Sequence, residues 1–131
     1  MENRRAGTTV KFTGHANTIR SIQVIESKKL IISAGNDRKL IFWDYEAKLQ
    51  IDSFPNLHKG HIIALAVSSD SSFVVSGSYD GSLKIFSIGL KKTIKFVKKL
   101  NFTNRVYSIG ISSDNSNLFC GGYNKKFFRR W

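Results

Sequence analysis

The sequence has one cysteine, Cys120, and one proline, Pro55, in 131 residues. A lone thiol cannot form an internal disulfide, and it excludes a zinc site built from several cysteines of this chain. No apolar run approaches the 18 or so residues of a membrane-spanning helix, and the first ten residues contain no hydrophobic stretch typical of a secretory signal. We therefore expect an intracellular protein, in the cytoplasm in preference to the nucleus.

Acidic residues are scarce, above all in the last third of the chain. Up to residue 83 there are ten Lys and Arg against eight Asp and Glu, whereas residues 84–131 hold eleven against Asp114 alone, and the net charge is +12. A basic segment of this kind can attract a polyanion by releasing counterions. Hydrophobic residues make up 41% and charged residues 23%, which is typical of one globular domain.

An internal repeat of 43 to 44 residues organises the chain. The stretch SAGNDRKLIFWD at 33–44 aligns with SGSYDGSLKIFS at 76–87, which places Asp37 over Asp80. A third copy, CGGYNKKFFRRW at 120–131, places Asn124 over Asp80, and residues 67–80 align on 111–124 without a gap. Two segments that keep one offset are strong evidence for a repeat architecture.

Each unit has the pattern of short strands separated by turns. Runs such as Leu30-Ile31-Ile32 and Phe73-Val74-Val75 are β-rich, and turn residues such as Asp80-Gly81 stand between them. No segment has a sustained helical period. Each unit is predicted to be a meander of about four strands. Residues 9–12 are predicted to be the outer strand of a unit whose other strands are missing, and one alternative is that they complete the last unit.

The repeat carries a resemblance to a known family. Gly14-His15, the turn residue Asp37 and the closing Trp43-Asp44 resemble the motif of WD-repeat β-propellers; the second unit keeps Asp80-Gly81 but has Phe86-Ser87 at the closing position. The resemblance implies an all-β fold, a partial β-propeller of about three four-stranded antiparallel blades. After a flexible N-terminus at 1–8, a single domain at 9–131 would comprise units at about 13–55, 56–102 and 103–131, the last incomplete.

The family resemblance also implies a hydrogen-bonded network that pins the turns to the strands. Its members would be His15, Ser33, Asp37 and Trp43 in unit one, and His58, Ser76 and Asp80 in unit two. His58 precedes Asp80 by 22 residues, as His15 precedes Asp37, whereas His61 is only 19 away. Phe86 has no indole N–H, so we expect unit one to be the stiffest. Unit three, with Phe102, Cys120 and Asn124 at these positions, should be the loosest.

A Ser, a His and an Asp also suggest a nucleophilic triad. The same three residue types recur with the same period, which a structural clamp requires and a single active site does not. No pair of histidines has a metal-ligand spacing, and no glycine-rich phosphate loop occurs. We therefore predict no catalytic residues, no metal, no cofactor and no enzyme activity.

A partner protein would meet the end of the propeller where two sets of connections open. The residue before each turn aspartate, or its equivalent, and the residue that starts each first strand lie there: Asn36, Tyr79, Tyr123, Thr18, His61 and Arg105. Tyrosine and arginine often anchor interfaces, so we interpret this rim as a candidate protein-binding surface. The alternative is that these are ordinary loop residues.

The basic stretch at 90–102 allows two interpretations. Lysines on the outer strand of a blade protect it from edge-to-edge pairing, and this is the interpretation we favour. The alternative is contact with RNA, DNA or an acidic partner through phosphate neutralisation. The candidate contacts are Lys91, Lys92, Lys95, Lys98, Lys99, Lys125, Lys126, Arg129 and Arg130.

Three blades are few for a propeller, which has about four to eight. We therefore expect a piece of a larger propeller or one half of a six-bladed dimer. In the last unit, one extra residue after Asn124 would place Trp131 at the position of Trp43 and Phe128 over Leu83. The function predicted is a non-catalytic protein-protein interaction scaffold, and the alternative is a polyanion-binding element at 84–131.

Overall fold

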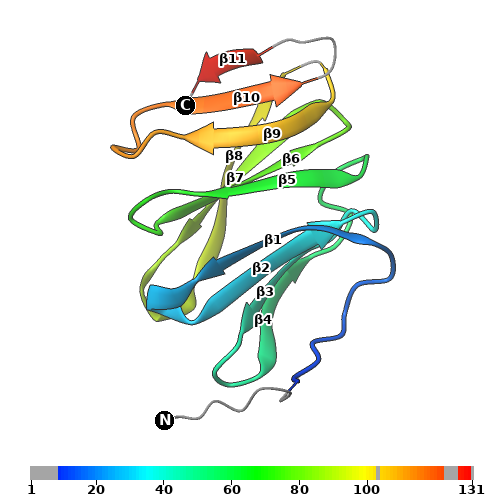
Figure 1. Cartoon of the computed structure of the whole chain (residues 1–131), viewed down its shortest axis with the longest axis vertical. Helices are drawn as coiled ribbons and strands as arrows, with labels where there is room; N and C mark the ends of the chain where they lie inside the picture. Colours follow the sequence, from blue (N-terminus) through cyan, green and yellow to red (C-terminus); the bar gives the residue numbers. More distant parts are fainter. Residues whose placement is uncertain (1–8, 103, 123–126, 131) are drawn as a thin grey trace.

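The computed structural model describes residues 9–102, 104–122 and 127–130 of the chain. They form three antiparallel sheets stacked one after another in chain order (Figure 1). The first sheet comprises β1 (Ile19–Ile25), β2 (Leu30–Gly35), β3 (Leu40–Asp44) and β4 (Leu49–Phe54). The second comprises β5 (Ile62–Val67), β6 (Phe73–Ser78), β7 (Ser82–Ile88) and β8 (Ile94–Asn101). The third comprises β9 (Val106–Ile111), β10 (Leu118–Gly122) and β11 (Phe127–Arg130).

Each sheet is a meander in which sequential strands pair, and this confirms the predicted all-β partial propeller. Two 3₁₀ turns, η1 (Glu26–Lys28) and η2 (Leu90–Lys92), connect β1 to β2 and β7 to β8. Among the residues described, no helix is long and apolar enough to cross a membrane.

The turns after β5 and β9 have the same construction. The Asp70 carboxylate accepts hydrogen bonds from the Ser72 N–H (3.0 Å) and hydroxyl (2.6 Å), and Asp114 accepts the same pair from Ser116. These hydrogen bonds lower the pKa of both carboxyls, to about 2 for Asp114. The Ser69 hydroxyl donates to the Ser113 carbonyl (2.6 Å), so the two turns also link neighbouring sheets.

Two apolar clusters hold the sheets together. Leu40, Phe42 and Ile32 of the first sheet face Val74 and Phe86 of the second. On its other face the second sheet contributes Val75, Leu83 and Ile85, which meet Val106 and Leu118 of the third. A Cβ atom at Gly77 would lie 2.5 Å from Val106 Cγ1, so this close approach of the second and third sheets requires glycine.

The N-terminal segment corrects one prediction. Residues 9–12 belong to no strand, and Phe12 packs on Trp43 with ring centroids 5.4 Å apart. They lie beside the first sheet, whereas β11 belongs to the third sheet, on the far side of the second (Figure 1). Because the third sheet is remote from them, they do not complete its blade.

The register of β11 corrects another prediction. Cys120 pairs with Phe128 and Leu118 with Arg130, as Ser76 pairs with Lys84 and Val74 with Phe86. The repeat therefore continues without an inserted residue, and the predicted slip is wrong. Phe127, not Phe128, takes the place of Leu83, because an unbroken ladder of backbone pairs sets the register and a bulge would interrupt it. Trp131 and Asn124 lie outside the described residues.

Candidate functional site: hydrogen-bonded turns and an aromatic rim

In unit one, four side chains from separate elements form a continuous hydrogen-bonded chain. His15 precedes β1, Ser33 lies on β2, Asp37 in the β2–β3 turn and Trp43 on β3. His15 Nδ1 lies 2.9 Å from Asp37 Oδ2, and Nε2 lies 2.7 Å from the Ser33 hydroxyl, which accepts from the Trp43 indole N–H at 2.9 Å. The Ala16 N–H also donates to Asp37 (2.9 Å). The turn is thereby tied to two strands.

In unit two, His58 makes the same contacts with a serine and an aspartate, and a second serine lies beside it. His58 Nε2 lies 2.8 Å from the Ser76 hydroxyl, and Nδ1 lies 3.2 Å from Asp80 Oδ2. Phe86 cannot donate, but Ser82 joins the network: its hydroxyl donates to Asp80 Oδ1 at 2.6 Å and lies 2.9 Å from His58 Nδ1. Sequence reasoning missed Ser82, although its place two residues after the turn aspartate is typical of a side chain that bonds back into its own turn.

Both networks have the connectivity of a nucleophilic triad, but their serines are enclosed. Ser33 is 4% exposed and Ser76 is fully buried, and Ser33 is already bonded to Trp43. A nucleophile must reach a substrate carbonyl, and both hydroxyls belong to residues that are almost fully buried. The geometry therefore serves to fix the turns. No group of three metal-ligating side chains occurs in the described part of the chain.

In unit two, His58 and Asp80 have different protonation states at neutral pH because burial and hydrogen bonds shift their pKa values. Desolvation lowers the pKa of His58 to about 4, against the opposing attraction of Asp80. Burial acts to raise the pKa of Asp80, but hydrogen bonds from the Ser82 hydroxyl and the Lys59 N–H outweigh it and hold that pKa at about 2. At neutral pH the histidine is neutral and the carboxylate ionised, so His58 Nδ1–H donates to Asp80 and Nε2 accepts from Ser76.

Unit three has apolar side chains at two of the corresponding positions. Phe102 is 8% exposed and Cys120 is 1% exposed, and both belong to the cluster between the second and third sheets. Burial raises the pKa of the Cys120 thiol to about 11, so it behaves as a packed hydrophobic group. Asn124, the third position, lies outside the described residues.

The described rim residues lie where the first strand of each sheet begins and the second strand ends. In the first two sheets they form backbone pairs. The Asn36 N–H donates to the Thr18 carbonyl (2.8 Å) and the Tyr79 N–H donates to the His61 carbonyl (3.0 Å). Thr18, His61 and Arg105 stand one residue before β1, β5 and β9, not at the first position of the strand. These backbone bonds bring the two connections of each unit together. Tyr123 lies outside the described residues.

Three of the rim residues, with one that sequence reasoning missed, form what we call the rim cluster: His61, Tyr79, Arg105 and Tyr107. The His61 ring stacks on Tyr79 with centroids 5.7 Å apart, and Tyr107 meets Tyr79 edge-on at 5.4 Å. The Arg105 guanidinium lies 4.8 Å from the Tyr79 centroid. Tyr107 on β9 is 40% exposed. Thr18 and Asn36 lie in unit one, where the Arg20 guanidinium bonds Asn36 (2.9 Å), and do not join the rings.

The candidate polyanion contacts that the structure describes belong to three elements, η2, β8 and β11. Lys91 and Lys92 lie in η2, before the outer strand, while Lys95, Lys98 and Lys99 follow along β8. Lys92 Nζ binds Asp44 at 2.6 Å, and its charge is compensated. Arg129 and Arg130 lie on β11, and Lys125 and Lys126 fall outside the described residues.

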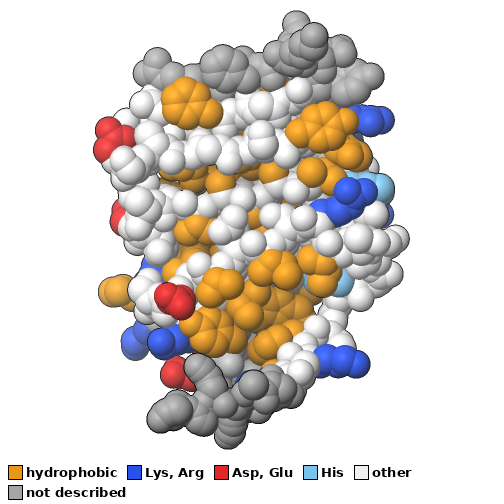
Figure 2. Space-filling model, in the orientation of Figure 1, with side chains coloured by type: hydrophobic (Ala, Val, Ile, Leu, Met, Phe, Trp, Pro, Cys, Tyr) orange, Lys and Arg blue, Asp and Glu red, His pale blue; other side chains and the backbone are white. Residues whose placement is uncertain are grey.

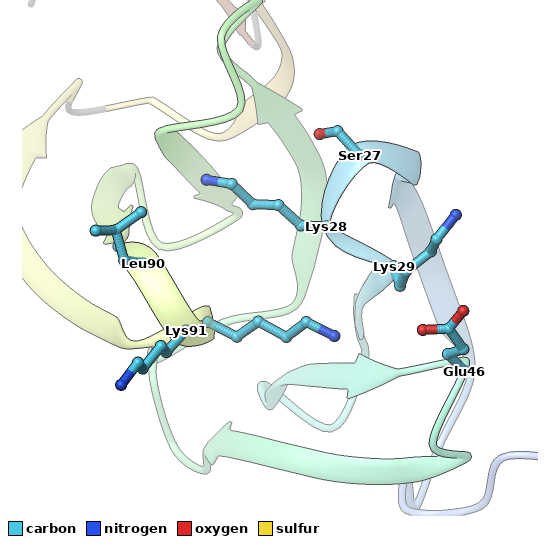
Figure 3. A pocket seen from close by; sticks show the side chains of 8 residues that line it. Ser27, Lys28, Lys29, Glu46, Leu90 and Lys91 are labelled. Carbon is cyan, nitrogen blue, oxygen red and sulfur yellow. The ribbon is translucent and has the colours of Figure 1, made fainter.

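The cavity beside η1 and η2 has four lysines in its lining, two of which bind across it (Figure 3). Lys28 extends from η1 toward the neighbouring sheet and donates to the Ser71 (2.8 Å) and Ile88 (3.3 Å) carbonyls. Lys92 of the second sheet binds back to Asp44 of the first. Lysines at this end of the stack therefore join the first two sheets.

The first sheet leaves part of its outer face, on the side of β1, uncovered among the described residues. Ile22 and Val24 of β1 are 56% and 54% exposed, and a cavity of about 220 Å³ lies among Phe12, Ile19, Ile31 and Trp43. Figure 2 shows hydrophobic side chains gathered over this sheet. The opposite face of the same sheet is buried against the second sheet.

Stacked four-stranded meanders with a repeated His, Ser and Asp turn network define a β-propeller-type repeat protein. The family described as "WD domain, G-beta repeat" matches residues 7–44 and 53–87, more than half of the sequence. The chain belongs to the WD40 repeat family.

Several known proteins are similar to this chain. "U3 small nucleolar RNA-associated protein 15" of Schizosaccharomyces pombe is 29% identical over 128 residues, 97% of this chain and 25% of that protein. "Ribosome biogenesis protein YTM1" of Scheffersomyces stipitis is 26% identical over 81% of this chain and 25% of that protein. The chain thus spans about a quarter of the length of these relatives. Among solved structures, the RRP9 WD40 repeats superimpose with a TM-score of 0.80 at 19% identity, over 89% of this chain and 36% of that one, which shows the shared fold.

Proposed function

We propose that this chain is a non-catalytic protein-interaction module, and that a partner protein binds the rim cluster. The observation that carries the proposal is the convergence of His61, Tyr79, Tyr107 and Arg105 on one end of the second and third sheets. Aromatic and arginine side chains supply much of the energy at protein interfaces. Their mutual contacts hold the rings in place before binding, which reduces the entropy lost on association.

The turn network of unit two holds the backbone next to the rim cluster. Tyr79 directly precedes Asp80, whose carboxylate is held by His58, Ser82 and the Lys59 N–H. A turn tied at three points presents its neighbouring ring on rigid backbone. Under this proposal the repeated geometry of the network is the framework, and the rim cluster is the contact surface.

The experiment uses the double variant Tyr79→Ser/Arg105→Glu, with Tyr45→Ser, at the other end of the stack, as the control. Partners would be identified by quantitative affinity capture of the wild-type chain, and each binary complex would then be measured by isothermal titration. We expect the rim variant to lose the binding that Tyr45→Ser retains, with thermal unfolding unchanged. A partner that binds both variants equally would overturn the proposal.

Ribosome assembly is the setting that we propose for this interaction. Two relatives bear names that refer to small nucleolar RNA and to ribosome biogenesis. These names give no support to the expected preference for the cytoplasm over the nucleus. Co-sedimentation of the tagged chain with pre-ribosomal particles would support the setting, and its presence only in light fractions would refute it.

For the uncovered face of the first sheet we propose a further four-stranded WD40 unit as the occupant. Its opposite face already packs on such a unit through the same kind of apolar side chains. The unit would come from additional repeats or from a second copy of this chain. If a second copy supplies it, light scattering gives about twice 14.8 kDa, and Ile22→Asp returns the monomer. If this chain alone is a monomer and a complex forms only with a chain that carries further repeats, additional repeats are the source.

The polyanion alternative rests on the basic balance of residues 84–131. Binding to RNA across a salt series is its test, because each neutralised phosphate steepens the dependence of affinity on salt. A flat response, or no binding at low salt, would remove this alternative without affecting the rim proposal.

A further inference from the structure

A third cavity, of about 310 Å³, opens beside the turn network of unit two, at the same ends of the strands as the rim cluster. Three lysines from separate elements line it: Lys59 from the connection before β5, Lys84 from β7 and Lys99 from β8. Lys84 and Lys99 are directly paired across the two strands. Two like charges opposite each other on a sheet are unfavourable, so the sequence maintains a local concentration of positive charge.

The equivalent place in unit one is filled. Ile41 stands at the position of Lys84, Ser53 at that of Lys99 and Ala16 at that of Lys59. Ile41 is fully buried, and a Cβ atom at Gly14 would lie 2.9 Å from the Trp43 ring. Unit two therefore has three lysines at positions that hold none in unit one, where one lysine, Lys39, donates to the Gly14 carbonyl (3.0 Å).

The charges in the cavity are incompletely balanced. Within the described part of the chain no carboxylate lies in ion-pair distance of Lys59, Lys84 or Lys99, and Lys84 Nζ donates to the Leu57 carbonyl. Asp80, the one acid in the lining, is engaged by His58 and Ser82. Burial, with Lys99 and Lys59 adding repulsion, lowers the pKa of Lys84. His58 is neutral at pH 7, so three ammonium groups and one carboxylate leave an excess of two positive charges.

We propose that this cavity binds the dianionic phosphate group of a phosphate monoester, free or carried by a larger molecule. Lys59, Lys84 and Lys99 line the space with ammonium-bearing side chains, and Asn56 and Asn101 in the same lining carry neutral amide donors. Two negative charges match the excess of two positive ones. Hydrogen bonds between charged partners are the strong ones, and several of them directed at one group compensate for its dehydration.

The shape favours a monoester over the phosphodiester of a nucleic-acid backbone. A diester carries one negative charge and continues in both directions, which suits an open groove lined along its length. The lysines here converge on one concavity, and the lysines of η2 lie at the other end of the stack. This proposal is independent of the rim cluster, whose residues do not line the cavity.

The experiment titrates the ¹⁵N-labelled chain with inorganic phosphate at pH 7.5, with sodium chloride adjusted to constant ionic strength. We expect saturable shifts of the amide signals of Asn56, Lys59 and Asn101. Lys59→Ala/Lys99→Ser, which installs the residues of unit one, should weaken binding at least about tenfold, since each charged hydrogen bond contributes about 1.5 kcal/mol or more. Lys11→Ala/Lys95→Ser removes the same charge outside the cavity and should bind as the wild type does.

Each outcome bears on the proposal. Equal weakening by both double variants, or shifts scattered over the whole surface, would show diffuse attraction and overturn it. If Lys59→Ala/Lys99→Ser changes the spectrum without phosphate, Lys84→Ile provides a second test with the residue found in unit one. A phosphoserine peptide and a 5′-phosphorylated nucleotide then distinguish the carriers of the monoester. Tighter binding of an unphosphorylated dinucleotide diester would refute the monoester class.

Discussion

The first two sheets share strand order, register and turn hydrogen bonds, but they differ in what surrounds the histidine. In unit one the space beside His15 is closed by Trp43, Ile41 and the close approach at Gly14. In unit two Phe86 turns entirely into the apolar cluster facing the first sheet, and lysines stand around the space beside His58. The comparison teaches that the His, Ser and Asp contacts persist without the tryptophan, and that Ser82 adds a different bond, to Asp80.

The largest difference in the free energy of unfolding should come from truncating Phe86 and Trp43, the aromatic residues at equivalent positions of β7 and β3. Phe86 is fully buried and meets Phe42 and Phe54 of the first sheet, so Phe86→Ala should cost about 3–5 kcal/mol in the free energy of unfolding. Trp43→Ala should cost less, because Trp43 packs on the uncovered face against Phe12. Urea unfolding followed by circular dichroism measures both. Equal losses would show that the two faces are equally covered.

Acid should affect unit two through its buried histidine. The unfolded chain takes up a proton near the ordinary pKa of 6.5, and folded His58 does so only near pH 4, so stability falls as the pH drops through this window. From pH 7 to pH 5 the free energy of unfolding should fall by about 2 kcal/mol through this group. His58→Gln cannot titrate and should have a correspondingly flatter pH profile. An unchanged profile would contradict the assignment.

A single substitution makes unit one resemble unit two. Trp43→Phe removes the indole N–H that donates to Ser33, and it should cost about 1 kcal/mol. A double-mutant cycle with Ser33→Ala separates this bond from the lost ring volume. Thermal unfolding of the four proteins gives the coupling energy. A coupling energy of zero would mean that the indole contributes by packing alone.

The smallest expected effect concerns the ion pair between the two sheets. Lys92→Ala removes the contact with Asp44, a half-buried pair near the surface, and ion pairs near the surface contribute little. We expect a slight loss of thermal stability at low salt that disappears at 1 M sodium chloride, where the Debye length is about 3 Å. Lys91→Ala, one residue away, is the control. A loss that persists at high salt would indicate packing by the lysine stem.

Much of this architecture can be predicted from the repeat alone. The offset of 43 to 44 residues assigns His15 to His58 and Asp37 to Asp80, and the distance of 22 residues selects His58 over His61. The failures occurred where side-chain pattern and backbone pairing disagree. At β11 a core-facing tryptophan suggested an inserted residue, but continuous pairing from Gly121–Phe127 to Leu118–Arg130 sets the register. Residues 9–12 have the composition of a strand and no partner strand among the described residues.

The candidate sites were predictable only in part. Tyr79, His61 and Arg105 follow from their places beside the turns, whereas Tyr107 joins them because β9 packs on β5, a contact between units. Lys59 and Lys84 gave no sequence signal, since one lies in a loop and the other on a strand.

The sequence by itself determined the repeat, the strand order within each unit and the residues of each turn network, because these depend on spacing along one chain. Only the tertiary structure decided which lysines compensate a carboxylate and which line a cavity. It likewise decided which aromatic rings meet across neighbouring sheets. Such relations depend on the stacking of sheets about 43 residues apart in sequence, and charge and ring contacts act through distances in space that local spacing does not encode.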